Sequence, residues 1–584
     1  MMKRSPRRAL LATAAILGSG LFSLPAAAQS IGYGDVSGGA GGMSGGSDMG
    51  DGPASGGGDA LPERRNGRTK VFEITPYIEA AQIVSAELSP GDDVVTYSQL
   101  SAGADATIAG RNNGLAMSVR YTRQFGWGGN TRDGDSISGL ANGYATVAPG
   151  LTLQAGGLAT RSDIDAGGGA VPARARFDDT ATQIYSVYAG PSYATRVGDA
   201  NVSANYRFGY TRSEQSDAFV ASPDGPAGDL FDESTTHIAD VQAGVAPGTV
   251  LPVGLAAAGS FYQEDISNLN QRVRDMQTRG IVTLPVGRTV QVSGAVGYED
   301  VEVSSRDAVR DADGNPVIDG NGRYVTDKSA PRIVAQDVSG LLWDVGVMWR
   351  PSPRTSLTAH VGRRYGATAV TGSFSYAPNS RSTLSIGVYN NVAGFGGQLT
   401  RALNGLPTDF TAVRDPITGE LRGCVASLES DTCLNGALGS VRSATFRARG
   451  ISASYNLALG RISTGIGGGY DRRKFIAAPG TVLAAANGVI DETYWLSAYI
   501  STELDVRSGI SGNVYATWLD STDPFAGDTS GFGATAAYYR ALTNHIQATA
   551  AVAVDGTSRD SDAFTTSVDD YWNASAFLGV RYSF

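Results

Sequence analysis

Charged side chains recur on the polar face of segments that otherwise alternate between apolar and polar residues. They are Arg120, Arg207, Arg350, Arg364, Arg581, Asp105 and Asp344. In a closed barrel this face lines the lumen, and rings of charge that line a pore select by charge, so one hypothesis is a pathway for anions or an acidic polymer. The second hypothesis is that the arginines pair with lumen and loop carboxylates and make the wall rigid. The mixture of both signs favours the second hypothesis.

The residues that could carry catalysis do not form a recognisable set. The chain has three histidines, His237, His360 and His545, which lie far apart in the sequence. None of them is placed with a serine and an acid in a way that suggests a nucleophile and its base. We therefore expect a protein that is not an enzyme and that needs no cofactor.

Residues 311–322 are rich in Asp, Asn and Gly, which provide the oxygen ligands and turns of calcium sites. The segment lacks the spacing and the terminal Glu of an EF-hand loop. Asp-Gly and Asn-Gly are also the pairs that β-turns require. The turn interpretation is favoured, and we expect no metal site.

The two cysteines of the chain, Cys424 and Cys433, lie in one short polar segment. In an oxidising compartment they could form a disulfide, and in a reducing one they would remain thiols. The disulfide is the favoured prediction.

The composition and the charge exclude some classes of protein. The net charge of −10 argues against nucleic-acid binding, because a duplex-binding surface needs an excess of Lys and Arg. With only 17% charged residues, the chain lacks the Lys/Glu-rich surface of soluble helical proteins. A β-rich protein is the better expectation.

The N-terminus predicts export. Basic residues precede an apolar run at residues 9–22, and Ala26, Ala27 and Ala28 provide a small-residue cleavage site, so residues 1–28 are predicted to be a signal peptide for the Sec pathway. Residues 29–69 are rich in Gly and Ser and are predicted to be a disordered periplasmic leader. The remainder, residues 70–584, is predicted to be a single outer-membrane barrel.

The barrel prediction depends on a period of two residues. At residues 100–108 and again at 202–210, apolar residues alternate with small or polar ones. Runs of about 10 such residues suit tilted strands that cross a bilayer. No stretch after the N-terminal run approaches the roughly 18 consecutive apolar residues of a transmembrane helix.

The connections separate a membrane barrel from a soluble sandwich. Tight turns, such as those at 149–150, 198–199 and 460–461, alternate with long polar segments, such as 163–180, 304–339 and 391–439. Short turns on one rim and long loops on the other are typical of outer-membrane barrels. We expect an all-β, antiparallel, up-and-down transmembrane barrel of roughly 22 strands, within a range of about 18 to 24, with both termini in the periplasm.

The final strand predicts how the barrel is assembled. Leu578, Val580, Tyr582 and the terminal Phe584 alternate with polar residues. This pattern resembles the signal by which the barrel assembly machinery recognises its substrates. The machinery, outer-membrane lipid and lipopolysaccharide are therefore the expected partners.

Residues 349–357 (Trp-Arg-Pro-Ser-Pro-Arg-Thr-Ser-Leu) and 362–366 (Gly-Arg-Arg-Tyr-Gly) resemble β-barrel porin families related to exosortase-associated (PEP-CTERM system) outer-membrane proteins. The first strand, at residues 73–78, is also similar to the start of their barrels. The resemblance implies an outer-membrane channel, with exopolysaccharide export components as further partners. The glycine-rich leader and the long cysteine-containing segment depart from the family pattern.

Together these observations predict a porin-like channel or a polysaccharide exporter in the outer membrane of a Gram-negative bacterium. The alternative is a closed structural or adhesive barrel whose long loops bind an outside surface. Whether loops fold into the lumen does not follow from the sequence.

Overall fold

The computed structural model describes residues 71–128, 133–164, 170–172, 181–215, 230–319, 323–379, 381–408, 410–426, 434–523, 528–560 and 570–584. The predicted signal peptide at 1–28 and the predicted leader at 29–69 lie outside these residues, so both remain predictions.

Twenty-two strands of the described residues form one closed ring in which every neighbouring pair is antiparallel. Each strand pairs with the next long strand of the chain, and β1 closes the ring by pairing with β25, as in Tyr77↔Ser583. This confirms the predicted up-and-down barrel and its strand number. The ring consists of β1 (Val71–Ser89), β2 (Val94–Ala109), β3 (Asn113–Trp127), β4 (Gly134–Ala148), β5 (Leu151–Ile164), β7 (Ala181–Val197), β8 (Ala200–Gln215), β9 (Glu233–Val245), β10 (Gly254–Ile266), β11 (Gln271–Pro285), β12 (Val290–Ser305), β13 (Ile333–Ser352), β14 (Thr355–Arg364), β15 (Ala367–Asn379), β16 (Ser382–Ala393), β19 (Thr445–Leu459), β20 (Ile462–Ile476), β21 (Ile490–Glu503), β22 (Ser508–Ser521), β23 (Asp528–Ala541), β24 (Ile546–Asp560) and β25 (Tyr571–Ser583).

The period-two pattern becomes two faces of one wall. On β25, Leu578 and Val580 are 65% and 48% exposed, whereas Phe577, which points to the other face of the same strand, is 4% exposed. Successive side chains of a strand point to opposite sides of a sheet, so the exposed series faces outward and the buried series faces the lumen.

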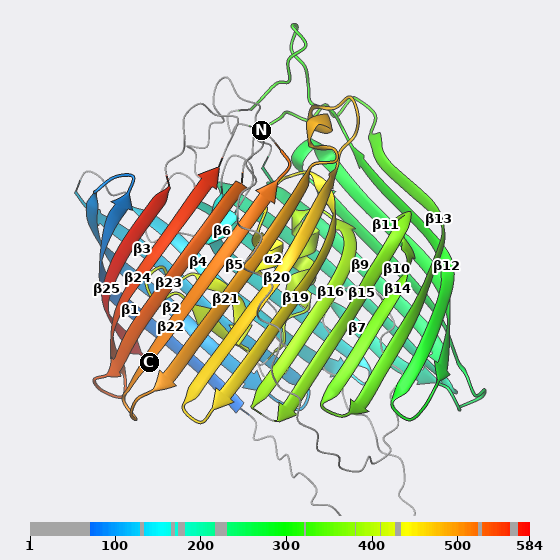
Figure 1. Cartoon of the computed structure of the whole chain (residues 1–584), viewed down its shortest axis with the longest axis horizontal. Helices are drawn as coiled ribbons and strands as arrows, with labels where there is room; N and C mark the ends of the chain where they lie inside the picture. The colour runs from blue at the N-terminus through cyan, green and yellow to red at the C-terminus, as the bar shows by residue number, and fades with distance from the viewer. Residues whose placement is uncertain are drawn as a thin grey trace, which may run out of the picture. The chain divides into compact units, whose positions relative to one another are not determined.

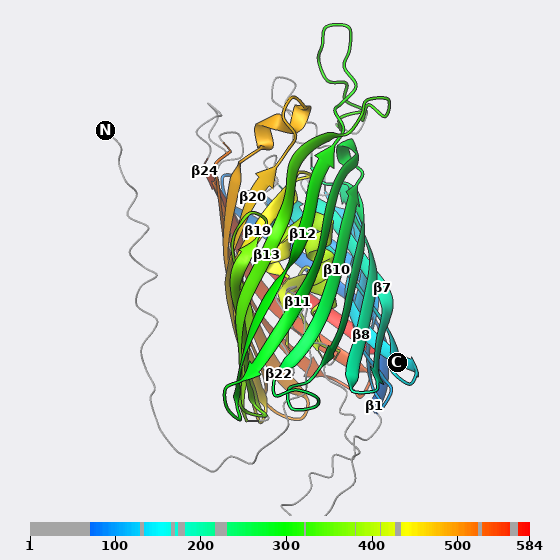
Figure 2. The same ribbon diagram turned by 90° about the vertical axis from the view of Figure 1, so that its right-hand side faces the viewer.

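The two ends of the barrel differ in their connections (Figures 1 and 2). One end has tight turns, including those predicted at 149–150, 198–199 and 460–461, and the chain ends there at Phe584. The sequence did not indicate two further connections at this end, at 246–253 and 380–381. The other end, called the outer end below, has most of the longer segments, with the short 3-10 helices η2 (Asn268–Asn270) and η3 (Val482–Ala486) and the short strand β6 (Ala170–Pro172).

Several strands are longer than the apolar runs that predict them. β13 has 20 residues, twice the expected length. β11 likewise continues past the apolar Met276 toward the outer end of the barrel, where it carries Arg274 and Arg272. Hydrogen-bonded pairing continues past the apolar band, because backbone pairing does not require apolar side chains.

The connection that follows β16 corrects the sequence analysis. Residues 391–439 were expected to be a polar outer loop, but β16 continues to Ala393, and residues 394–408, 410–426 and 434–444, called the inner loop below, fold against the inside of the wall. The inner loop contains α1 (Phe395–Asn404), a hairpin of β17 (Thr411–Arg414) and β18 (Leu421–Ala426), and α2 (Asn435–Leu438). Helix α1 contacts β5, β7, β8, β9 and β16. The physical reason is an apolar stripe at helical spacing, Phe395, Leu399 and Leu403, which is fully buried.

The wall overlaps itself at one place. Residues 333–342 of β13 pair only with β12, because the β14–β15 hairpin reverses at Tyr365 and does not extend as far toward the outer end as β13. Val388 on β16 pairs with Ile451, which faces outward. Val392 lies on the same side of β16 as Val388, yet it is fully buried. It packs against Tyr262 and Val273, which lie on the lumen sides of β10 and β11. The outer end of β16 therefore lies inside the β10–β11 wall.

No helix in the described part of the chain is long and apolar enough to span a membrane.

Candidate functional site

The inner loop begins at a buried carboxylate. The oxygens of Glu264 on β10 accept hydrogen bonds from the backbone N–H groups of Gly394 (2.6 Å) and Gly397 (2.8 Å) and from the hydroxyl of Tyr262 (2.6 Å). Glu264 is 0% exposed. Its negative charge lies at the N-terminus of α1, where unpaired N–H groups and the helix dipole favour an anion. The barrel wall thus caps the helix of the inner loop.

The end of α1 is held by polar groups of other wall strands. Arg207 on β8 donates to the side-chain oxygen of Asn404 at 3.1 Å. Asn142 on β4 donates to the backbone oxygens of Leu406 and Pro407, and its own oxygen accepts a hydrogen bond from Tyr188 at 2.6 Å. These bonds fix the last residue of α1 and the segment that follows it.

The β17–β18 hairpin is attached through Arg414. Its guanidinium donates to the hydroxyl of Ser118 (3.0 Å) and of Ser138 (2.6 Å) and to the backbone oxygens of Ser118 (2.8 Å) and Gly419 (2.7 Å). One arginine therefore joins the hairpin to β3 and β4. Because the planar guanidinium has five donors in a fixed arrangement, it can hold several acceptors at once.

The turn of this hairpin reaches a further part of the wall. Asp415 accepts hydrogen bonds from the backbone N–H groups of Ile417 (2.9 Å) and Thr418 (2.8 Å) and from the hydroxyl of Thr535 on β23 (2.5 Å). Ile417 is buried in a cluster with Ile83 and Phe577 of β1 and β25. The turn end of the hairpin is therefore fixed to two parts of the wall.

Gly419 in the same turn lies directly over Arg120, one of the predicted lumen arginines. The φ of Gly419 is +72°, and a Cβ added there would lie 2.7 Å from Nε of Arg120. Arg120 also forms an ion pair of 2.7 Å with Glu79 on β1. Only glycine fits this position, because any other side chain would meet both the strain of the positive φ and the guanidinium.

The last part of the inner loop is held by a buried ion pair. Arg473 and Asp471 on β20 are 2.8 Å apart, and each side chain is 1% exposed. The same guanidinium donates to the backbone oxygens of Ser440 (2.5 Å) and Ala437 (3.0 Å). Figure 1 shows α2 behind β20 and β21, which it contacts.

A second charged cluster lies where the wall overlaps. Arg364 and the hydroxyl of Tyr365 both donate to Asp275 on β11, at 2.7 and 2.8 Å, and the backbone N–H of Tyr365 donates to Glu299 at 3.1 Å. Tyr365 has a φ of +56°, which is costly for a residue other than glycine. These contacts offset the strain of the turn.

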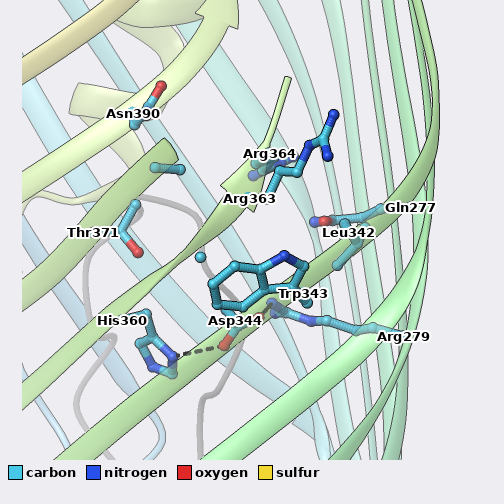
Figure 3. Close-up of a pocket in the computed structure, with 12 residues that line it drawn as sticks. Gln277, Arg279, Leu342, Trp343, Asp344, His360, Arg363, Arg364, Thr371 and Asn390 are labelled. Carbon is cyan, nitrogen blue, oxygen red and sulfur yellow. Dashed lines mark hydrogen bonds and ion pairs between the residues drawn. The ribbon is translucent and has the colours of Figure 1, made fainter. Parts of the chain in front are cut away.

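A small hollow adjoins this cluster, with space of about 40 Å³ for water-sized molecules. In Figure 3, His360 and Asp344 are joined by a hydrogen bond, and Arg279, Arg364 and Asn390 come from the surrounding strands. His360 Nδ1 lies 3.0 Å from Asp344, which also pairs with Arg279 at 3.4 Å. The lining combines these charged groups with the apolar side chains of Leu342 and Trp343.

The remaining predicted charges occupy different positions. Arg581 on β25 pairs with Asp105 on β2 at 3.0 Å and lies over the ring of Tyr77 at 3.5 Å. Arg350 lies on β13 near the tight-turn end, away from the inner loop. The structure therefore brings Arg120 and Arg207 to the inner loop and Arg364 and Asp344 to the overlap.

The other predicted residues are placed as follows. Tyr582 and Phe584 are exposed on the outer side of β25 with Leu578 and Val580. The backbone of Cys424 belongs to β18, but its side chain and the whole of Cys433 lie outside what the structure describes, so the disulfide remains a prediction. The histidines are separated: His237 is on β9, His360 on β14 and His545 in the turn before β24.

Residues 311–319 form the predicted turn, in which the carboxylate of Asp311 accepts hydrogen bonds from the N–H groups of Asp313 (3.0 Å) and Asn315 (2.8 Å). In the same loop the hydroxyl of Ser329 lowers the pKa of Asp327 by donating to its carboxylate at 2.6 Å. The described residues contain no group of His, Cys, Asp or Glu arranged to hold a metal.

Sequence reasoning missed Glu79, Glu264 and Asp415. Glu264 is detectable in principle, because it alternates with Tyr262 and Ile266 on one face of its strand and thus lies on a buried series. Its backbone partners Gly394 and Gly397 are not detectable in this way, since they lie about 130 residues further along the chain.

Comparison with known proteins identifies no family. No protein-family model matches the chain, and no curated protein matches it. The apoprotein of the FrpB iron transporter from Neisseria meningitidis is similar to the structure with a TM-score of 0.40 and 11% identity, over 87% of this chain and 81% of that one. The ferric-catecholate import receptor Fiu from E. coli K12 has a TM-score of 0.38 and 9% identity, over 87% and 81%. The siderophore receptor PirA from Acinetobacter baumannii has a TM-score of 0.38 and 9% identity, over 88% and 81%.

Proposed function

We propose that this protein is a solute channel of a Gram-negative outer membrane, narrowed by its inner loop. The observation that supports this proposal most directly is the closed ring of strands, which is apolar outside and polar inside. Leu100, Val241 and Leu578 are 52%, 55% and 65% exposed on its outer face. Such a surface would be unfavourable in water and suits lipid. A closed ring also leaves no unpaired strand edge in the hydrocarbon.

The inner loop sets the width of the passage. A ring of 22 strands has room for an aqueous lumen. The loop crosses part of this space, where it is held by Glu264 at one end and by Arg414 and Asp415 at the hairpin. A channel of this kind would pass small hydrophilic solutes and exclude large ones.

The charges of the lumen favour weak ion selectivity. Arg120 pairs with Glu79, Arg581 pairs with Asp105, and Arg279 pairs with Asp344. A charge with a close partner of opposite sign contributes little net field to the passage. Reversal potentials close to zero in a salt gradient are expected, and a strong preference for anions would support the anion pathway instead.

The test is single-channel recording in planar bilayers. The purified wild-type protein should give small conductance steps. A variant in which a short Gly-Ser linker replaces residues 411–426 should give larger steps, because it lacks the hairpin. If neither protein conducts, the channel proposal is wrong.

A closed structural or adhesive barrel is the second candidate. It is favoured by the attachment of one hairpin to two parts of the wall, through Arg414 to β3 and β4 and through Asp415 to β23. In that case the wild type gives no steps and binding to an outside surface depends on the outer segments. Opening of the channel only when the hairpin is removed would support this candidate.

The resemblance to exosortase-associated porins supports a role in exopolysaccharide export as a finer form of the channel proposal. The same proposal includes export through Sec, insertion by the barrel assembly machinery through the strand that ends at Phe584, and both termini in the periplasm. Loss of surface polysaccharide in a deletion strain, restored by the wild-type gene, would support the export role. Unchanged polysaccharide would leave only passage of small solutes.

A further inference from the structure

The outward face of β19 and β20 carries three basic residues near the outer end, Arg449, Arg472 and Lys474. Arg449 lies directly opposite Arg472. The next pair on this face is Ile451 and Tyr470, and Ile451 is 45% exposed, so the series faces outward. Like charges placed opposite each other across two strands repel. These three residues are called the basic patch below.

The protein neutralises only part of the basic patch. Arg472 pairs with Glu492 at 3.2 Å. Arg447, opposite Lys474, does not belong to the patch, because its β16 partner Val392 is buried in the overlap and its guanidinium donates there to Asn390 at 3.1 Å and to the backbone of Tyr365 at 3.5 Å. Arg449 and Lys474 form no ion pair with any residue that the structure describes.

The opposite part of the wall has a different arrangement at the same end. There the outward-facing arginines have acidic partners on their own or neighbouring strands. The pairs are Arg212 with Glu214 at 3.2 Å, Arg272 with Asp265 at 2.5 Å and Arg274 with Glu302 at 3.7 Å. The unpaired positive charge on β19 and β20 is therefore a local feature and not a general property of the outer end.

The height of the basic patch matches a lipid headgroup. The rings of Tyr470 and Tyr494 lie 5.0 Å apart just below it. Tyrosines on the outside of a barrel favour the boundary between hydrocarbon and headgroups. Arg472 and Lys474 follow Tyr470 by two and four residues, or about 7 to 13 Å along the strand.

We propose that the basic patch binds the phosphate groups of a phosphorylated glycolipid in the outer leaflet, namely lipid A. Phosphate is the matching chemistry, because guanidinium groups donate paired hydrogen bonds to its oxygens and one phosphate neutralises both members of a like-charge pair. The proposal rests on the proposed location in the outer membrane. It does not depend on whether the lumen conducts.

The test is native mass spectrometry of the full detergent-purified protein with lipid A that carries both phosphates and with the same lipid after their removal. The wild type should retain the phosphorylated lipid. The double variant Arg449→Gln/Lys474→Gln should bind it at least about tenfold more weakly. Each basic residue near an anionic lipid contributes about 1 kcal/mol, so the two together exceed the roughly 1.4 kcal/mol of a tenfold change.

Two control variants separate lipid recognition from folding. Arg461→Gln removes a charge from the tight turn at the other end of the same strand pair and should leave binding unchanged. Arg449→Lys/Lys474→Arg retains the charges and should also bind, while circular dichroism should show the same β-structure in every variant. The proposal is overturned if the double variant binds like the wild type, if the dephosphorylated lipid binds equally well, or if inorganic phosphate binds as tightly as the lipid.

The outcomes also separate this proposal from the channel. A wild type that conducts but does not retain lipid A contradicts only the lipid site. A wild type that retains lipid A but does not conduct contradicts only the channel. The double variant should keep the wild-type conductance, because the basic patch faces away from the lumen.

Discussion

A carboxylate oxygen of Glu264 lies 2.8 Å from the backbone nitrogen of Gly397, although 133 residues separate them in the chain. This hydrogen bond, with its neighbour to Gly394, ties the first turn of α1 to the barrel wall. We therefore expect Glu264 to decide whether the inner loop stays folded against the wall.

Replacing Glu264 with Gln should loosen α1. Gln keeps the size of the side chain but loses the charge and one acceptor, so the helix N-terminus should be destabilised by about 1.5 to 3 kcal/mol. Hydrogen exchange of the α1 amides should become faster. Asp265→Asn changes the adjacent residue on the outer face of β10 and should leave this exchange unchanged; equal effects in both variants would contradict the capping role.

Gly419→Ala should displace the β17–β18 turn and increase the conductance. The added Cβ would lie 2.7 Å from Arg120, in a backbone conformation with a φ of +72°. Gly460→Ala is a matched control: its φ is +59°, but nothing lies within 4 Å of the added Cβ. Both variants carry the backbone strain of about 1 to 2 kcal/mol, so only the first should change single-channel conductance. A wild-type conductance in Gly419→Ala would show that the hairpin does not limit the passage.

Arg364→Met should strongly destabilise the place where the wall overlaps. It leaves Asp275, which is 2% exposed, without its cation, and the loss of one partner of a buried pair costs about 3 to 5 kcal/mol. The double variant Arg364→Met/Asp275→Asn should recover part of this loss in urea unfolding from lipid vesicles. Arg363→Met, at the outward-facing neighbour, should be close to neutral. Additive effects of Arg364→Met and Asp275→Asn would argue against the pair.

The disulfide between Cys424 and Cys433 predicts a simple labelling result. An alkylating reagent should leave both cysteines unmodified in the unfolded, unreduced protein and should modify both after reduction. Cys424→Ser should release one thiol that reacts without reductant. Modification of both wild-type cysteines before reduction would show that they are free.

The faces and ends of the strands follow from the sequence, whereas the partners of the lumen charges do not. The alternation from Trp572 to Phe584 predicts both faces of β25, and the tight turns predict where most strands reverse, because these are properties of neighbouring residues. The same alternation places Arg120, Arg364 and Asp344 on the lumen face. It does not show which acids they meet, since Glu79 and Asp275 come from other strands.

The sequence by itself determined an antiparallel barrel of about 22 strands, the faces of those strands and the rim with tight turns. Only the tertiary structure decided that the inner loop folds inward and that the wall overlaps at Val392. The physical reason is that a period of two residues reports on which side of a strand a residue lies. The path of a long connection instead depends on contacts such as Glu264 with Gly397, which form only when distant segments are brought together.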